Sequence, residues 1–236
     1  MEQLKALIVG LVVGFVLAIP PGPIGFAVVK HAVERKNRAA AELAGGAATM
    51  DTVYATAATF ASSTVVAALG ESLTRHRWIA LVFQIACVAV LVVLGARYWR
   101  GAPDAAPASE RAFAVEQAQE ARAKKLGVAN PFLFGMFVAI TNVASPTFLP
   151  SLVFLTGFLT TAGWLPLDTG SRLLFALGFG LGTFGWFLAL LRALMAMKDK
   201  LAARISVRVQ RFAGGAFIAF AAILAAKVVA SAEWAR

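Results

Sequence analysis

Long apolar runs are the feature that most constrains how this chain can fold. Runs near or above the ~18–20 apolar residues that cross a bilayer occupy residues 4–30, 39–70, 78–97, 131–161, 172–197 and 210–231. Lipid offers no partner for backbone N–H and C=O groups, so such a run must be helical unless strands close into a barrel. None of the runs alternates in polarity as barrel strands do. The sequence therefore predicts an all-α membrane protein with six transmembrane helices.

Composition and charge agree with this class. The chain is 60% hydrophobic and 14% charged, whereas a soluble domain carries roughly 25% charged residues. Its 22 lysines and arginines outnumber 12 acidic residues. The basic residues lie between the apolar runs and leave no basic domain that could bind nucleic acid. We expect the lipid bilayer and a small-molecule substrate as partners, and no nucleic acid.

The basic residues are distributed unevenly between the two sides of the membrane. The first, third and fifth connections hold four, six and six of the 22 lysines and arginines. The positive-inside rule places these connections in the cytoplasm. It places both termini outside the cytoplasm. We expect a multi-pass protein of the cell (inner) membrane. The first run is longer than a signal-peptide core and lacks a small-x-small cleavage site before its prolines, so we expect it to be retained.

The longest polar connection, about 98–130, divides the chain in two. Its letters "SERAFAVEQAQEARAKK" predict a short, mostly polar surface helix. We expect residues 1–100 to form a first three-helix repeat, 101–130 a cytoplasmic linker and 131–236 a second three-helix repeat. Because three crossings are an odd number, the second repeat would be inverted in the membrane.

Proline-bearing interruptions occur at corresponding places in the two halves. The letters "PPGP" break the first span, and "TNVASPTF" breaks the fourth. Pro20 lies 16 residues beyond Leu4, and Pro146 lies 15 beyond Pro131. Paired interruptions of this kind are typical of inverted-repeat transporters, whose binding sites they frame. The sequence predicts that helices 1 and 4 are broken.

A break inside the membrane needs a reason, because it exposes backbone polar groups. Such groups are tolerated only where they are buried in protein or face a hydrated cavity. The half-helix that restarts near Ile24 and Gly25 would direct free N–H groups toward that cavity, an arrangement that suits a carboxylate. The alternative is that the prolines are kinks that only improve packing.

Asp51 is the only acidic residue near the middle of any span. Exposing it to lipid would cost about 2.5–3.5 kcal/mol, so it must face the bundle interior. It follows Arg38 by 13 residues, about 20 Å of helix, and 12 residues separate Pro23 from Arg35. The break and Asp51 therefore lie at similar depth. Asp51 could bind a substrate ammonium or carry a coupling proton; alternatively, it is a protonated side chain satisfied by a backbone carbonyl.

The second half supplies no matching carboxylate. The repeat offset of 126 residues, measured from Pro20 to Pro146, takes Asp51 to Leu177. The candidate substrate- or proton-binding residues are therefore Asp51, Pro20, Pro21, Gly22, Pro23, Gly25, Thr141, Asn142, Ser145 and Pro146.

Other motifs do not indicate a cofactor, a metal or an enzyme. The letters "GFGLGTFG" match a dinucleotide fingerprint, but no strand precedes them, so they predict close helix packing. His31 and His76 lie at loop edges on opposite sides, which excludes a shared metal. Cys87 is the single cysteine and cannot run disulfide exchange. Small-residue faces on spans two and five leave room for a homodimer.

The first half resembles the LysE-type (lysine exporter) amino-acid exporter superfamily. Gly22 and Pro23 match the family's Gly-Pro pair in helix one, and Gly46 with Asp51 matches the Gly-x-x-x-Gly-Asp element of helix two. Met50 stands where the family usually has glycine. The letters "NPFLFGMF" are similar to the opening of the family's fourth helix, whereas "TNVASPTFLP" and "ERKNRAA" depart from its pattern.

The resemblance implies export of amino acids or related small metabolites, driven by a proton gradient or by exchange. We expect a secondary transporter rather than an enzyme. A passive channel or a non-catalytic structural membrane protein is the alternative, because the same broken helices could frame a pore.

Overall fold

The computed structural model describes residues 2–19, 22–75, 105–143 and 148–196, with short stretches at 85, 88–89, 92–93, 96, 215, 218–219, 221–223 and 225–226. Its helices are α1 (Glu2–Ala18), α2 (Pro23–Val33), α3 (Asn37–Arg75), α5 (Ala105–Lys125), α6 (Pro131–Val143), α7 (Phe148–Thr161) and α8 (Thr169–Ala196). The described part of the chain contains no strand, which confirms the all-α class. Most of the expected spans 78–97 and 210–231, including Cys87, lies outside the described residues.

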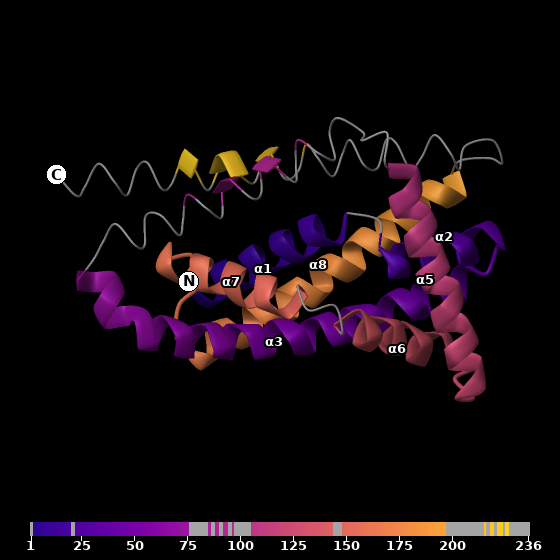
Figure 1. Cartoon of the computed structure of the whole chain (residues 1–236), viewed down its shortest axis with the longest axis horizontal. Helices are drawn as coiled ribbons and strands as arrows, with labels where there is room; N and C mark the ends of the chain where they lie inside the picture. The colour runs from indigo at the N-terminus through magenta and orange to yellow at the C-terminus, as the bar shows by residue number, and fades with distance from the viewer. Residues whose placement is uncertain are drawn as a thin grey trace.

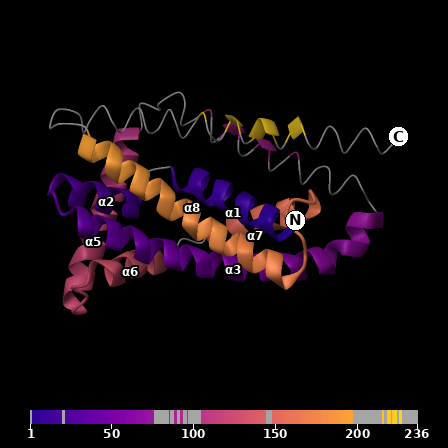
Figure 2. The ribbon, with the colours of Figure 1, turned by 180° about the vertical axis from the view of Figure 1, so that it is seen from behind.

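Two long helices form the centre of the bundle (Figure 1). α3 and α8 run in opposite directions and cross each other, α1 lies along α8, and α6 and α7 follow α3 in its own direction. Figure 2 shows the α1–α8 side from behind. The linker helix α5 lies across the end of the bundle that also holds α2 and the first turns of α3 and α6.

The helix ends follow from local sequence. α1 stops at Ala18, just before the proline pair, because a residue that precedes proline disfavours helical geometry. α2 restarts with Pro23 at its first position, where a missing N–H costs nothing. α6 also begins with a proline, Pro131. Unlike α2, it has a side-chain cap: Asn130 Oδ1 accepts hydrogen bonds from the backbone N–H groups of Phe132 (2.8 Å) and Leu133 (3.3 Å).

The span lengths are confirmed only in part. Among the described helices, α8 alone is long and apolar enough to cross a bilayer unaided. α1 and α2 reach that length only together, and they are bent by 75° at the break between them. α6 and α7 each contain a shorter apolar helix, Pro131–Thr141 and Leu152–Thr161. The interruptions predicted from the sequence thus coincide with helix ends on both sides.

Glycines allow α1 and α8 to approach at backbone contact. A Cβ at Gly10 would lie 2.1 Å from the carbonyl oxygen of Phe175, and a Cβ at Gly178 would lie 2.2 Å from that of Leu7. One turn later, Gly14 faces Phe179 at 2.0 Å and Gly182 faces Leu11 at 2.1 Å. Each glycine thus faces the residue three positions before the opposing glycine. In lipid, close backbone packing of this kind is a main source of helix association.

The same reciprocal contact occurs between α3 and α6. A Cβ at Gly46 would lie 2.0 Å from the Phe132 carbonyl oxygen, and one at Gly135 would lie 2.0 Å from that of Leu43. Each residue again lies three positions before the opposing glycine. The small-residue faces of α3 and α8 are therefore occupied inside the chain, which removes the reason given by the sequence for a homodimer.

The rest of the core is apolar and falls into two clusters. One joins α1, α3, α7 and α8 around Phe158 and Phe175, and the other joins α2, α3, α6 and α8 around Leu43 and Val138. Large apolar side chains are also exposed on the outside of the bundle, among them Ile8, Val53, Leu133, Ile140, Leu177 and Leu181. An apolar exterior suits a bilayer, which takes the place of water as solvent.

Candidate functional site

The first break separates α1 from α2. Pro20 and Pro21 lie outside the described residues; Gly22 caps α2 in an extended conformation without a side-chain cap. The first backbone bond of α2 runs from the Phe26 N–H to the Gly22 oxygen at 3.0 Å. The N–H groups of Ile24 and Gly25 precede this bond, so the helix itself provides no acceptor for them. They are donors at the positive end of a helix, as the sequence predicts.

The second break separates α6 from α7. Residues 144–147, which include Ser145 and Pro146, lie outside the described residues, and Asn142 lies in the last turn of α6. α6 ends 125 residues after α1 ends, and α7 begins 125 residues after α2 begins. The two interruptions therefore have the same length and the same position within their halves.

Asp51 lies in α3 and is partly exposed in the isolated chain. Its carboxylate interacts with the Thr183 side chain of α8. Thr183 is buried, and its hydroxyl oxygen lies 3.5 Å from the Gly14 oxygen of α1. Gly14 precedes the end of α1 by four residues, about 6 Å. Asp51 and Thr183 thus lie about one helical turn from the first break.

The second break lies at the same level. The Thr156 hydroxyl of α7 donates to the Ala58 oxygen of α3 at 3.3 Å. Ala58 follows Asp51 by seven residues, and Thr156 follows Phe148, the first residue of α7, by eight. Because α3 and α7 run in the same direction (Figure 1), Asp51 and the start of α7 are at similar heights. Both breaks and Asp51 share one level of the bundle.

The family of the chain follows from a comparison over nearly its whole length. A family model, "LysE type translocator", matches residues 15–228. The chain belongs to this family. It is thus a membrane translocator of a transporter family, as its resemblance to LysE-type exporters indicates. No curated protein and no solved structure matches the translocator.

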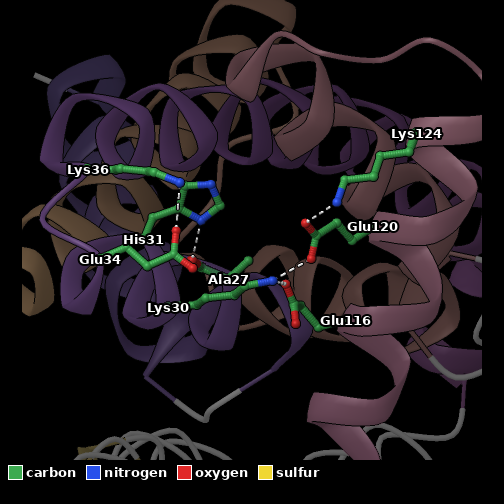
Figure 3. Close-up of polar contacts among 8 residues, drawn as sticks. All are labelled: Ala27, Lys30, His31, Glu34, Lys36, Glu116, Glu120 and Lys124. Carbon is green, nitrogen blue, oxygen red and sulfur yellow. Dashed lines mark hydrogen bonds and ion pairs between the residues drawn. The ribbon is translucent and has the colours of Figure 1, made fainter.

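The translocator carries a polar cluster that sequence reasoning did not identify. The linker helix α5 packs against α2 and α6, and its Glu116 and Glu120 both face Lys30 of α2 (Figure 3). Lys30 lies 3.6 Å from Glu116 and forms an ion pair and hydrogen bond with Glu120, which also pairs with Lys124 at 3.2 Å. The sequence signal was the i, i+4 spacing of Glu116, Glu120 and Lys124 on one face of the predicted linker helix.

The two carboxylates have opposite electrostatic environments. Burial raises the pKa of Glu116 above its ordinary value, because its side chain is enclosed and neither oxygen has a hydrogen-bond donor among the described residues. The hydrogen bond from Lys30 lowers the pKa of Glu120. The Lys30 ammonium group therefore lies beside two carboxylates, Glu120, whose charged form it stabilises, and Glu116, whose charged form is poorly solvated.

Thr141 contacts this linker helix. Its hydroxyl donates to the backbone oxygens of Phe137 (3.0 Å) and Val138 (2.9 Å), and it accepts a 2.8 Å hydrogen bond from the amide nitrogen of Gln119. Thr141 was predicted from its position beside the second break. The structure adds that α5 is bonded to the last turns of α6, close to that break.

Proposed function

We propose that this translocator is a secondary transporter that exports amino acids or related small metabolites across the cytoplasmic membrane. The observation that carries the proposal is the common level of Asp51 and the two helix breaks. Polar groups cost free energy in a bilayer, and their concentration at one level is typical of a transport site near the membrane midplane. The family to which the chain belongs supports transport in general.

The chemistry at this level suits an amphoteric solute. The N–H groups of Ile24 and Gly25 at the start of α2 would hold a carboxylate, because a helix N-terminus is a donor-rich, positive site. Asp51 would hold the ammonium group or exchange the coupling proton. Asn142, Ser145 and Pro146 at the second break, with Thr141, would complete the site from the other half.

We further propose six spans in two inverted three-helix repeats joined by the linker 101–130. Three relations support this arrangement: the equal offset of 125 residues at both breaks, the glycine contact of α1 with α8, and its counterpart of α6 with α3. In such an inverted repeat, the first span of each half contacts the second span of the other half. The contact of α1 with α8 and the contact of α6 with α3 are the two contacts of this kind. The positive-inside rule supports cytoplasmic placement of α5 and non-cytoplasmic termini.

Uptake into inverted membrane vesicles tests the function. Vesicles from cells that express the protein receive labelled amino acids of several side-chain classes, with and without an imposed proton gradient. We expect gradient-dependent accumulation of at least one amino acid by the wild-type protein and none by Asp51→Asn. Equilibration without accumulation would instead support a passive channel.

Controls separate transport from folding. Asp51→Asn must reach the membrane at the wild-type level and elute as a single species in detergent, because loss of expression would also abolish uptake. Wild-type rates in a well-folded Asp51→Asn would assign Asp51 to packing. Unchanged transport in Pro146→Ala would remove the second break from the proposed site.

A further inference from the structure

The reciprocal glycine contacts give an equivalence between the two halves that sequence spacing alone did not. Gly10 and Gly178 form a reciprocal pair in the α1–α8 contact, because each faces the residue three positions before the other. Gly135 and Gly46 form the same kind of pair in the α6–α3 contact. Gly10 therefore corresponds to Gly135, an offset of 125 residues, which both helix breaks also show. Gly46 corresponds to Gly178, an offset of 132 residues.

The second offset corrects the assignment of Asp51 to Leu177. A single offset of 126 residues assumes segments of equal length in the two halves. α7 is three residues longer than α2, and the connection from α7 to α8 is four residues longer than the connection from α2 to α3, which together account for the seven residues between the offsets of 125 and 132. Leu177 is 50% exposed on the outside of α8 and cannot occupy an interior site. With the offset of 132, Asp51 corresponds to Thr183, the buried residue that its carboxylate contacts.

If a two-fold axis relates the two halves and passes between α3 and α8, a residue beside the axis in one half must contact the equivalent residue of the other half. The offset of 132 relates Ala48 to Gly180, and a Cβ at Gly180 would lie 2.8 Å from the Ala48 oxygen. The same offset relates Asp51 to Thr183, and these side chains interact. Two pairs of counterparts, one turn apart, are thus in mutual contact where α3 and α8 cross.

We propose that Thr183 is the second-half partner of Asp51 in a polar pair on the axis between the repeats, and that its hydroxyl positions the Asp51 carboxylate for substrate or proton binding. This inference rests on the proposed function above. The two halves then contribute equivalent backbone positions to the site, but one half supplies a carboxylate and the other a hydroxyl. The Thr183 hydroxyl oxygen lies 3.5 Å from the Gly14 oxygen beside the first break, so Thr183 lies between that break and Asp51.

Conservative substitutions separate positioning from packing. Thr183→Val keeps the side-chain shape and removes the hydroxyl, whereas Thr183→Ser keeps the hydroxyl. Because hydrogen bonds to charged groups are roughly twice as strong as those between neutral groups, we expect Thr183→Val to lower uptake about tenfold to a hundredfold. Thr183→Ser should retain most of the wild-type rate. Wild-type uptake by Thr183→Val would overturn the proposal.

A matched control comes from Thr156. It is also buried, and its hydroxyl donates to a backbone oxygen of another helix, but it has no carboxylate partner in the described contacts. We expect Thr156→Val to transport at close to the wild-type rate. An equal loss in Thr156→Val and Thr183→Val would assign both hydroxyls to packing and overturn the proposal.

An exchange of the two side chains tests the symmetry directly. Asp51→Thr and Thr183→Asp should each lose transport, because one lacks the carboxylate and the other brings two together. The double variant restores one carboxylate and one hydroxyl at equivalent places, so we expect measurable uptake to return. A double variant that folds as well as the wild type but is as inactive as Asp51→Thr would count against the axial pair.

Cross-linking tests the pair without any transport assay. With Cys87→Ala and a protease site in the linker, a short bifunctional thiol reagent should join Asp51→Cys to Thr183→Cys, so that the cleaved halves stay together on a denaturing gel. Asp51→Cys with Leu177→Cys is the matched control and should separate. Cross-linking of the control alone would overturn the equivalence. If the axial pair cross-links in the variant but the wild-type protein moves no amino acid in the vesicle assay, the equivalence stands and the proposed function is refuted.

Discussion

The amide nitrogen of Gln119 donates a 2.8 Å hydrogen bond to the hydroxyl of Thr141, which joins the linker helix α5 to α6 near the second break. The Gln119 side chain is buried, and its amide oxygen has no hydrogen-bond partner in the part of the chain that the structure describes. A buried amide with one satisfied group depends strongly on that bond. The docking of α5 should therefore be sensitive to either residue.

We expect Gln119→Leu to lower the free energy of local opening of α5 by about 1 kcal/mol, the net contribution of a neutral hydrogen bond. Hydrogen exchange of the amides between Val115 and Lys125 should become about fivefold faster. Gln117→Leu, a change on the exposed face of the same helix, is the control and should leave this exchange unchanged. Equal acceleration in both variants would show that the bond does not hold α5.

The two carboxylates that share Lys30 should give opposite pH dependences. The pKa of Glu116 is raised by burial, so its contribution to stability falls as the pH rises from about 4.3 through the raised pKa. The pKa of Glu120 is lowered by Lys30, so its contribution is present above about 4.3 and is lost as the pH falls through the lowered pKa.

Thermal unfolding in detergent between about pH 3 and 8 measures these slopes, because the Glu120 effect lies below about pH 4.3 and the Glu116 effect above it. Relative to the wild type, Glu116→Gln should gain stability as the pH rises, and Glu120→Gln should lose it. Lys30→Met should destabilise the protein by about 1–3 kcal/mol at neutral pH, because Glu116 is left buried without a countercharge. Identical slopes for the two glutamine variants would contradict the assigned environments.

Adjacent glycines in α3 should respond very differently to a single methyl group. A Cβ at Gly46 would lie 2.0 Å from the Phe132 oxygen, a backbone atom that cannot move aside, whereas one at Gly45 would lie 3.6 Å from the Phe132 ring. Gly46→Ala should therefore destabilise the protein by about 1–3 kcal/mol. Gly45→Ala should be neutral or slightly stabilising. Equal melting temperatures for both variants would contradict the close approach of α3 and α6.

Two exposed loop residues test the proposed orientation. Leu126 follows α5 and Leu167 precedes α8, and their side chains are 68% and 54% exposed. In a Cys87→Ala background, a membrane-impermeant maleimide should label Leu167→Cys in intact cells and Leu126→Cys only in inverted vesicles. The opposite pattern would reverse the orientation, and labelling of both from one side would refute an odd number of crossings between them.

Several features of this protein were predictable because they depend on local sequence. The class follows from apolar runs that only helices can satisfy in lipid, and the helix ends beside Pro23 and Pro131 follow from the geometry of proline. The surface helix of the linker was predicted from its polar letters. In each case the physical cause lies within a few residues of the feature it produces.

The partner of Asp51 was not predictable in this way. A threonine within an apolar run has the same local signal whether it packs against a backbone oxygen or faces a carboxylate across the bundle. The single offset of 126 residues pointed to Leu177. A longer helix α7 and a longer connection to α8 shift the register of α8 relative to α3 without changing the apolar pattern of either helix.

The sequence by itself therefore determined the all-helical membrane class, the positions of the breaks and the placement of Asp51 at their level. Only the tertiary structure decided that Thr183 faces Asp51 and that α5 is docked through Lys30 and Thr141. The reason is that contacts between helices depend on their relative register. Here that register is set by backbone contacts at Gly10, Gly46, Gly135 and Gly178 between segments far apart in the chain.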